Sequence, residues 1–409
     1  MKVVLLNTGT ELLLGDVCDA HLSFIAREIL PLGLRIAEQR TVPDGTAIRD
    51  ALSDVIPRAD IVFVTGGLGP TTDDITRDIT ADLLGLELIR NDEVMRAITQ
   101  RLSERRIKIT DRILRQADVP RGSQVLPNDH GSAPGLFLRS QANASRPSPH
   151  LFLLPGPPRE LQPMFRDYVL PLLRSLVKPQ IIERRLYKIA NTGESIVEEA
   201  VGKKILAIPG VELGYCARPG EVDLRIVGDP DAVGHAHTII MQALGPCIFS
   251  SEDETLEEVI VKSLARRHET VSVAESCTGG WLANRITNVP GASDVFLTGF
   301  VTYANEAKID LLNVASTLLE QHGAVSSEVA LAMAEGARAR AKSTHALATT
   351  GVAGPDGGSV DKPVGTVFVA LATANAATVV KRLFFPTDRE TFKEMVAQVA
   401  FDLLRKKLV

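Results

Sequence analysis

Ser276 and Lys308 are the residues of this 409-residue chain whose types and settings best suit nucleophilic catalysis. Ser276 ends the run TVSVAES and opens the turn Ser-Cys-Thr-Gly-Gly, after which a helical pattern begins. Lys308 lies one turn inside a later helical pattern that follows the run GFVTYA. A lysine buried beside a tyrosine and an apolar wall has a lowered pKa, and its neutral amine can accept the proton of a serine hydroxyl. The pattern therefore predicts a Ser-Lys pair, with an ordinary solvated helix lysine as the alternative.

The turn after Ser276 is the second feature with chemical meaning. The N–H groups at the start of a helix lack intrahelical partners, and Gly279 and Gly280 let a ligand approach the backbone closely. Such a turn can bind a phosphate or the oxyanion of a tetrahedral intermediate. A serine at this position also commonly caps a helix and does nothing else. The turn alone favours neither interpretation.

Two further strand ends in this part of the chain carry polar or glycine-rich segments. The strand 296–304 is expected to bring Tyr303 to its end, and Asn305 is expected to cap the next helix. The strand HALATTG ends in a loop that contains Gly351 and Gly354, whose N–H groups can wrap a phosphate or a ribose. The alternative for Tyr303 is an aromatic side chain at the rim of the domain, and the alternative for the two glycines is that they only form tight turns. Three such segments in one domain together predict a ligand site.

The first part of the chain places glycine, threonine and acidic residues at successive strand ends, in NTGTELLLGD, VFVTGGLGPTTDDITRD, LPNDHGSAPGL and LFLLPGPPREL. In open parallel sheets such ends converge on one edge. Glu11, Asp44 and Asp74 are the hard oxygen ligands that Mg²⁺ prefers and bridges to phosphates. The alternative is that Asp73 and Asp74 cap a helix and that Asp78 is solvated.

The elements that position these residues alternate between strand and helix. Between residues 2 and 67 the pattern reads strand, helix, strand, helix, strand, which is typical of an α/β fold with a parallel sheet. Two more apolar runs, GLFLR and HLFLLPG, flank the segment 139–150, which is predicted to be a loop at a hairpin tip. A second alternation of strands and helices runs from residue 270 to a C-terminal helix that begins at Thr387.

Three domains are predicted along the chain. Residues 1–172 and 253–409 are expected to form three-layer α/β domains, and residues 173–252 read as a small α+β module between them. The content of this module invites comparison with an RNA-binding KH domain. It lacks a GxxG loop and has a negative net charge, so a structural or dimerising role is favoured.

The composition excludes several classes of function. The 45 Lys and Arg stand against 50 Asp and Glu, so the net charge of -5 leaves no chain-wide basic field for nucleic acid or an anionic membrane. No apolar run reaches the about 18 residues of a membrane-spanning helix, and no signal-peptide pattern is present, so a cytoplasmic location is expected. The four cysteines show no CxxC pairing and are expected to be reduced thiols.

Five segments together resemble the C-terminal domain of the CinA family: AESCTGG, GFVTYANEAK, HGAVS, TTGVAGPDGG and KPVGTV. The resemblance implies a nicotinamide mononucleotide amidohydrolase, which forms nicotinate mononucleotide and ammonia and needs no cofactor. It implies that Ser276 is the nucleophile or activates water, that Lys308 is the general base, and that Tyr303 orients the pair. One departure is Ala304, where a serine is expected in many relatives.

The same resemblance assigns substrate contacts. Thr350 and the N–H of Cys277 would serve the carbonyl oxygen, and Arg389 in FPTDR would face the substrate phosphate. The full implied set in this domain is Cys277, Thr278, Gly279, Gly280, Asn305, Thr350, Gly351, Gly354 and Arg389.

The first domain resembles the molybdopterin-binding domain of molybdenum cofactor enzymes, in the form that makes up the N-terminal half of CinA proteins. The resemblance implies hydrolysis of ADP-ribose to AMP and ribose 5-phosphate, dependent on a divalent metal (Mg, Mn or Co) and stimulated by K⁺. The implied metal ligands are Glu11, Asp44 and Asp74, and the implied substrate loop, GGLGP, contains Gly66, Gly67 and Gly69.

This first domain departs from the family pattern at His21, where an asparagine is expected, and at Ser132, where threonine is usual. The expected partners are small-molecule nucleotides, with neither a membrane nor direct nucleic-acid binding, and the family implies a homodimer. Two alternatives stay open. The first domain could bind a molybdopterin-like pterin without turnover, or the chain could be a competence or DNA-damage accessory protein without catalysis.

Overall fold

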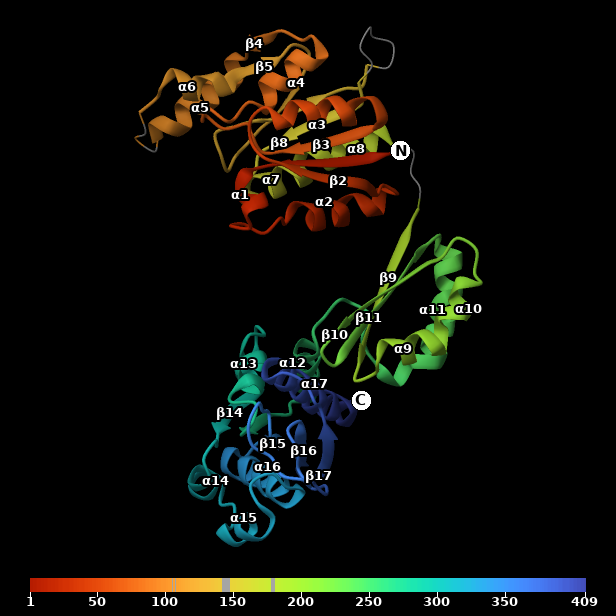
Figure 1. Ribbon diagram of the computed structural model, residues 1–409, viewed down its shortest axis with the longest axis vertical. Coiled ribbons are helices and arrows are strands. Elements are labelled where there is room, and N and C mark those ends of the chain that lie inside the picture. The colour runs from red at the N-terminus through yellow and green to blue at the C-terminus, as the bar shows by residue number, and fades with distance from the viewer. Residues whose placement is uncertain (105, 107, 142–147, 178–180) are drawn as a thin grey trace. The chain divides into compact units, whose positions relative to one another are not determined.

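A six-stranded sheet forms the centre of the first part of the chain in the computed structural model, which describes residues 1–104, 106, 108–141, 148–177 and 181–409 (Figure 1). The strand order is β2-β1-β3-β8-β7-β6, and β2, β1, β3 and β8 are parallel. The strands are β1 (Val3–Thr8), β2 (Ile36–Val42), β3 (Ile61–Thr65), β6 (Gln124–Leu126), β7 (Gly135–Leu138) and β8 (His150–Leu154). β1 and β3 are buried along their whole length, as is typical of a parallel sheet covered on both faces.

Helices cover both faces of this sheet, because alternate residues of each strand point to opposite sides. Val3 and Leu5 of β1 belong to the core beneath α2, α7 and α8, whereas Val4 and Leu6 belong to the core beneath α3 and α4. The helices are α1 (Thr10–Leu14), α2 (His21–Ile29), α3 (Ala47–Val55), α4 (Thr76–Leu84), α7 (Pro158–Met164) and α8 (Leu170–Leu176). The predicted three-layer α/β arrangement of this domain is confirmed.

A small helical outgrowth follows α4, and the sequence patterns predicted no elements there. It contains a two-stranded ribbon of β4 (Leu88–Arg90) and β5 (Asp118–Pro120), together with α5 (Asp92–Glu104) and α6 (Asp111–Leu114). Its apolar side chains form a separate small core that includes Val94, Ile98, Leu102 and Ala117. The outgrowth therefore has its own small hydrophobic core, separate from the cores on the two faces of the main sheet.

One long helical segment with an irregular middle follows β8. α7 passes through a π-helical turn (Phe165–Val169) into α8. Pro163 lacks the N–H that a helix interior needs, and helical irregularities of this kind accommodate such a loss. The predicted domain boundary after residue 172 lies inside α8, and the first compact unit extends to Ile182.

The hairpin predicted around residues 139–150 has both of its strands. β7 and β8 pair antiparallel, with Leu136 opposite Leu153 and Leu138 opposite Leu151. Residues 142–147 of the predicted loop lie outside the described residues.

The second compact unit, Glu183–Val409, begins with an antiparallel four-stranded sheet in the order β10-β11-β9-β12. The strands are β9 (Glu183–Ala190), β10 (Glu212–Arg218), β11 (Glu221–Gly228) and β12 (Ile248–Ser250), and the helices are α9 (Glu194–Val197), α10 (Lys203–Leu206) and α11 (Pro230–Leu244). These elements share one core, which contains the buried ring of Tyr187. The predicted small α+β module is confirmed.

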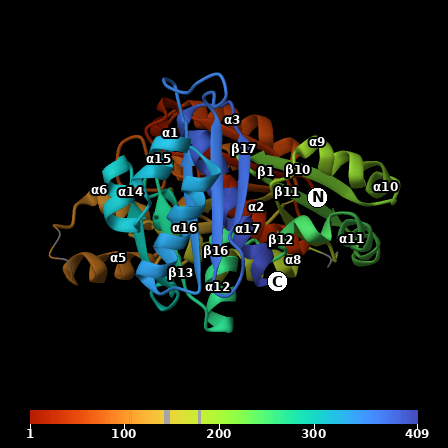
Figure 2. The same cartoon turned by 90° about the horizontal axis from the view of Figure 1, so that it is seen from below.

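A five-stranded sheet in the order β14-β13-β15-β16-β17 forms the rest of this unit. Its strands are β13 (Val271–Glu275), β14 (Phe296–Val301), β15 (His345–Gly351), β16 (Thr366–Thr373) and β17 (Val379–Phe384). Its helices are α12 (Leu256–Arg267), α13 (Trp281–Thr287), α14 (Asn305–Leu312), α15 (Ser316–His322), α16 (Ser327–Ala341) and α17 (Arg389–Leu408). α12, α13 and α17 share a core on one face of the sheet, and α14 and α16 share a core on the other. α16 packs against β15 and β16 in this second predicted three-layer domain, and Figure 2 shows α16 beside β16.

Polar contacts join the small module to this last domain. Gln398 on α17 donates a hydrogen bond to Glu221 of β11 at 2.8 Å, and Asn191 after β9 donates to Asp402 at 3.1 Å. No helix among the described residues is long and apolar enough to cross a membrane. All four cysteines are free thiols.

Candidate functional site

The predicted Ser-Lys pair lies at the ends of the parallel strands of the C-terminal sheet. Ser276 continues β13, since its N–H donates to the carbonyl oxygen of Thr349 on β15 at 2.9 Å. Lys308 comes from the first turns of α14, and its Nζ lies 3.3 Å from the Oγ of Ser276. The same ammonium donates to the carbonyl oxygens of Thr302 at 2.8 Å and Tyr303 at 3.2 Å. The structure thus brings together a hydroxyl and an amine that lie 32 residues apart in the sequence.

Burial gives Lys308 the character of a base. The residue is only 1% exposed, so it is not the solvated helix lysine of the alternative interpretation. Loss of water around the ammonium lowers the pKa of Lys308 below the ordinary lysine value, and the nearby Cys277 and Glu306 oppose this shift only in part. A larger fraction of the amine is therefore neutral near physiological pH than for an exposed lysine.

The start of α13 differs from the sequence-based prediction. Gly280 occupies the cap position with φ 95°, so Ser276 does not cap the helix. The buried carboxylate of Glu275 accepts hydrogen bonds from the N–H groups of Gly280 at 3.0 Å, Leu282 at 3.0 Å and Ala283 at 2.9 Å. Three of the helix-start N–H groups that the sequence left open as anion donors are therefore already bound by a carboxylate of the chain.

The residues between Ser276 and α13 keep two donors. The N–H groups of Cys277 and Thr278 make no hydrogen bond with another described residue. The hydroxyl of Thr278 donates to Glu275 at 2.7 Å and lies 2.7 Å from the hydroxyl of Thr349, which fixes the turn. Burial raises the pKa of the Cys277 thiol to about 12, so the thiol stays protonated and is no rival nucleophile.

Tyr303 and Arg389 lie at the rim of this site. Tyr303 is 61% exposed, and its contact with Lys308 is through its backbone carbonyl rather than its hydroxyl. Arg389 at the start of α17 donates to the Tyr303 hydroxyl at 2.9 Å and to the carbonyl oxygen of Gly354 at 2.9 Å. Asn305 is the first residue of α14 and Ala304 occupies the cap position, so the predicted Asn305 cap was wrong.

The glycine-rich loop after β15 forms the third side of the site. The hydroxyl of Thr350 donates to the carbonyl oxygen of Ala324 at 2.7 Å, so it is already bonded within the protein. A Cβ on Gly354 would lie 2.5 Å from a methyl carbon of Val364, and a Cβ on Gly351 would lie 2.7 Å from the carbonyl oxygen of Thr366. Both glycines are therefore required by packing, whatever they do toward a ligand.

A second candidate site lies at the carboxyl ends of the strands in the first unit. A cavity of about 360 Å³ is lined by the predicted residues Glu11, Asp44, Gly66, Gly67, Gly69 and Asp74. Asp73 and Glu160 also line it, and none of the described residues around it is a lysine or an arginine. The structure therefore gathers all six predicted residues of this domain around one acidic cavity.

The carboxylates of this cavity are partly engaged by neighbouring loops. Asp44 accepts hydrogen bonds from the N–H and the hydroxyl of Thr10 at 2.9 and 3.2 Å, and Asp74 accepts from the N–H of Thr71 at 2.8 Å. In the part of the chain that the structure describes, no three His, Cys, Asp or Glu side chains lie close enough together to hold a metal ion alone. The predicted metal ligands are thus arranged around the cavity rather than gathered on one point.

The GGLGP loop depends on glycine for its path. Gly66 and Gly67 have φ values of 93° and 68°, which side chains rarely adopt. A Cβ on Gly66 would lie 2.5 Å from the Thr8 hydroxyl, and one on Gly67 would lie 2.0 Å from the Thr76 hydroxyl. The cap position of α4 is Ile75, so the alternative in which Asp73 and Asp74 cap this helix was wrong.

Two buried residues of this domain were not predicted as site residues, and one of them lines the cavity. Glu160 is only 9% exposed, lines the cavity and accepts a hydrogen bond from Asn128 at 2.9 Å. The signal in the sequence that could have identified Glu160 is its position in LFLLPGPPREL, one of the segments at the strand ends. His21 is buried with its Nδ1 3.2 Å from the Thr65 hydroxyl, and burial lowers its pKa, so its ring is neutral near pH 7.

Comparison with known proteins gives a family match for each of the two α/β domains. The model of the CinA C-terminal domain matches residues 253–408, and the model described as "Probable molybdopterin binding domain" matches residues 4–175. These two matches cover the two α/β domains and leave the small module between them.

Relatives match the chain over its whole length. A CinA-like protein of Akkermansia muciniphila is 41% identical over 98% of this chain and 96% of its own length, and a CinA-like protein of Koribacter versatilis is 39% identical over 98% of both. The crystal structure of the competence/damage inducible protein CihA from Agrobacterium tumefaciens covers 38% of this chain and 97% of its own, with 37% identity and a TM-score of 0.35. The chain belongs to the CinA family, as the sequence motifs predicted.

Proposed function

We propose that the C-terminal domain hydrolyses the carboxamide of nicotinamide mononucleotide to give nicotinate mononucleotide and ammonia. The observation that carries this proposal is the 3.3 Å contact between Lys308 Nζ and Ser276 Oγ, with the lysine buried. Amide hydrolysis needs a nucleophile and a base in contact, and this pair supplies both at the carboxyl ends of the parallel strands β13, β14 and β15. The family to which the chain belongs supports the choice of substrate.

The reaction follows from the roles of four groups. Ser276 Oγ attacks the carboxamide carbon while its proton passes to the neutral amine of Lys308. The amide oxygen takes up negative charge, and the N–H groups of Cys277 and Thr278 are the donors available to stabilise it. The C–N bond then breaks, Lys308 returns the proton to the leaving nitrogen, and ammonia departs from an ester on Ser276.

Water completes the cycle. It attacks the ester carbon while Lys308 takes one of its protons. When the ester bond breaks, that proton returns to Ser276 Oγ and nicotinate mononucleotide is released. In each step the charge that develops lies close to buried groups of the turn and of α14. A fixed hydrogen-bond donor stabilises such a charge more strongly there than in water.

The test is ammonia release from nicotinamide mononucleotide by the full-length protein. Ser276→Ala should lose activity by several orders of magnitude, since it removes the nucleophile. Ser293→Ala, at an exposed serine of the same domain, is the matched control and should leave the rate unchanged. No ammonia from the wild-type protein, or equal rates in both variants, would refute the proposal.

For the first domain we propose metal-dependent hydrolysis of ADP-ribose to AMP and ribose 5-phosphate. The specific observation is a cavity lined by five carboxylates, Glu11, Asp44, Asp73, Asp74 and Glu160, and by no described lysine or arginine. A diphosphate can enter such a cavity only with cations, which agrees with a role for Mg²⁺, Mn²⁺ or Co²⁺ and for K⁺.

The carboxylates around the cavity fit a divalent cation that is also held by the substrate. Mg²⁺ is commonly held by one or two carboxylates together with waters and substrate phosphates, so three carboxylates on one point are not needed. One or two of the three carboxylates Glu11, Asp44 and Asp74 would hold the ion, which when bound would neutralise the diphosphate and polarise it toward attack by water. The backbone of Gly66, Gly67 and Gly69 lies beside them and can approach a phosphate closely.

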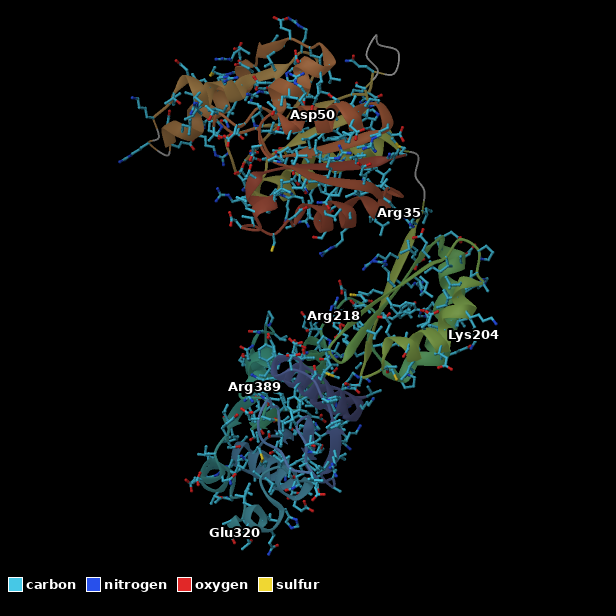
Figure 3. All side chains as sticks on the ribbon, in the orientation of Figure 1. Arg35, Asp50, Lys204, Arg218, Glu320 and Arg389 are labelled. Atoms are coloured by element: carbon cyan, nitrogen blue, oxygen red, sulfur yellow. The ribbon has the colours of Figure 1, made fainter. Side chains whose placement is uncertain are left out.

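AMP formation from ADP-ribose with each metal tests this second function. Asp44→Asn should lower the rate at least about a hundredfold, because it removes a charge that would hold the ion. Asp50→Asn is the control, since Asp50 is exposed on α3 and does not line the cavity (Figure 3). Metal-stimulated AMP formation by wild type that Asp44→Asn leaves intact would contradict the assignment.

A further inference from the structure

The helix α13 is held from the side by one arginine. Arg285 of α13 donates to the carboxylate of Glu257 on α12 at 2.7 Å and to the side-chain oxygen of Gln398 on α17 at 2.8 Å. Its guanidinium carbon also lies 4.9 Å from the centre of the Phe401 ring of α17. The side chain of Arg285 is only 17% exposed. These contacts fix α13 against both neighbouring helices.

The opposite end of α13 fixes the turn that follows β13. Glu275 accepts three hydrogen bonds from N–H groups at the start of the helix, and Ser276 is the next residue. The donors proposed for the amide oxygen, the N–H groups of Cys277 and Thr278, belong to the same turn. A shift of α13 would therefore move the hydroxyl and these donors relative to Lys308. Displacements of less than 1 Å are enough to change a catalytic rate.

Gln398 joins this arrangement to the small module. Its side chain is buried and uses both polar atoms of the amide, because the oxygen accepts from Arg285 and the nitrogen donates to Glu221 of β11 at 2.8 Å. Glu221 also accepts from Lys188 of β9 at 3.4 Å. The turn before β11 packs on the same side chain, since a Cβ on Gly220 would lie 2.9 Å from the Cβ of Gln398. A continuous series of contacts therefore runs from the module to α13.

We propose that the small module holds α13, and through it the turn that carries Ser276, in the position that deamidation requires. Gln398 and Arg285 are then positioning residues, and the module sets the rate of the C-terminal site without contacting its substrate. The proposal rests on the proposed deamidation for its reaction. It adds a role for the module in the regulation of that same site.

An exchange of two residue types in the full-length protein tests this series of contacts. Gln398→Glu places a carboxylate against Glu221 and removes the donor, although an oxygen still faces Arg285. Adding Glu221→Gln reverses donor and acceptor, so the hydrogen bond can form again.

Asn191→Asp is the matched control. It places a carboxylate against Asp402, in the other polar contact between the module and α17. Asn191 reaches Gln398 only at the backbone carbonyl oxygen, at 3.5 Å. Aspartate also tolerates the positive φ of Asn191, 53°. The control therefore disturbs the same junction without touching the contact between Gln398 and Arg285.

Two quantities are measured on each protein: ammonia release from nicotinamide mononucleotide, and hydrogen–deuterium exchange of residues 276–287. We expect Gln398→Glu to lower kcat about tenfold, to leave KM within about twofold and to speed the exchange of this segment. The double variant should recover most of both losses, and Asn191→Asp should change neither quantity. Unchanged kcat or exchange in Gln398→Glu, equal effects of the control, or no recovery in the double variant would overturn the proposal.

The exchange measurement separates this proposal from the proposed reaction. A wild-type protein that releases no ammonia refutes the deamidation. Faster exchange of residues 276–287 in Gln398→Glu, with recovery in the double variant, would then still support the coupling between the module and α13, and unchanged exchange would overturn it.

Discussion

At the scale of single residues, the burial and the contacts of Lys308 determine its chemistry more than its being a lysine. Its ammonium contacts two backbone carbonyl oxygens and one hydroxyl, and the residue is 1% exposed. Desolvation therefore lowers the pKa of Lys308, and the neutral amine becomes available to Ser276. The sequence motif predicted the pairing of these two residues, because a strand end and the first turn of a helix place them at the same sheet edge.

This setting predicts how deamidation depends on pH. Lys308 acts as a base only when neutral, so kcat/KM should rise with pH and level off above the pKa of Lys308. Because that pKa is lowered, the midpoint should lie below 10.5, the ordinary value for lysine. A pH profile of ammonia release measures the midpoint. A rate that falls as pH rises through this range, in a protein that stays folded, would contradict Lys308 as the base.

Glu275 shows where residue types alone were insufficient. The sequence suggested that the N–H groups at the start of α13 are free, because a glycine-rich turn before a helix is typical of anion sites. In the structure the carboxylate immediately before Ser276 binds three of them. Successive side chains of a strand point to opposite faces of the sheet, so the sequence alone does not show where the Glu275 side chain points. The path of the turn after β13 directs it to the start of α13.

At the scale of elements, Glu275 holds the turn that carries Ser276. It links the end of β13 to the start of α13 through charge-assisted hydrogen bonds in a fully buried setting. Glu275→Ala would leave these buried N–H groups without partners, and we expect a loss of more than about 2 kcal/mol in the free energy of unfolding.

Urea unfolding of the full-length protein, followed by circular dichroism, measures this loss. Glu275→Gln should restore part of it, because an amide oxygen can still accept from the helix. Glu320→Ala, at an exposed glutamate of α15, is the control (Figure 3). An unfolding curve for Glu275→Ala that matches the control would show that the carboxylate does not hold the turn.

Much of the fold was predictable because strands buried on both faces are continuous apolar runs. VVLLNT, IVFVT and HLFLL are such runs, and all three lie in the central sheet of the first unit. The outgrowth around α5 was not predicted, since its ribbon strands have only three residues each and its core is small. The length of the α7 to α8 segment was also missed, because Pro163 and Pro171 are signals that usually end a helix.

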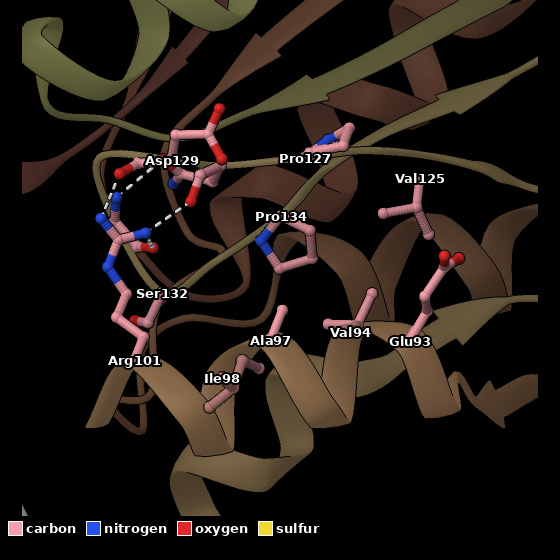
Figure 4. A pocket seen from close by; sticks show the side chains of 12 residues that line it. Glu93, Val94, Ala97, Ile98, Arg101, Val125, Pro127, Asp129, Ser132 and Pro134 are labelled. Carbon is pink, nitrogen blue, oxygen red and sulfur yellow. Dashed lines mark hydrogen bonds between the residues drawn. The ribbon is translucent and has the colours of Figure 1, made fainter. Parts of the chain in front are cut away.

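At the scale of the whole molecule, the two candidate sites belong to different compact units of the chain. One uses a lysine and a serine, and the other uses carboxylates around an acidic cavity. The chemistry that we propose for the first uses no metal, whereas the chemistry that we propose for the second uses cations to admit a diphosphate. The fold of each unit was predictable from its own sequence patterns. The packing of α5 against the loop that contains Gly131 (Figure 4) was not, because Arg101 and Gly131 lie 30 residues apart in the sequence.

A chelator should therefore separate the two activities. We expect EDTA to abolish AMP formation from ADP-ribose and to leave ammonia release from nicotinamide mononucleotide within about twofold of its original rate. Both rates are measured on one preparation of the full-length protein, and added Mg²⁺ should restore the first. Loss of ammonia release on chelation would mean that the C-terminal site requires a metal.

The most direct test of the central claim is the kcat for ammonia release in four proteins: wild type, Ser276→Ala, Lys308→Met and the double variant. A nucleophile and its base act as one unit, so each single variant should lose nearly as much activity as the double variant. Lys381→Met, at an exposed lysine of the same domain, should retain the wild-type rate. Near-normal turnover in either single variant, or losses that simply multiply in the double variant, would contradict the Ser276–Lys308 pair.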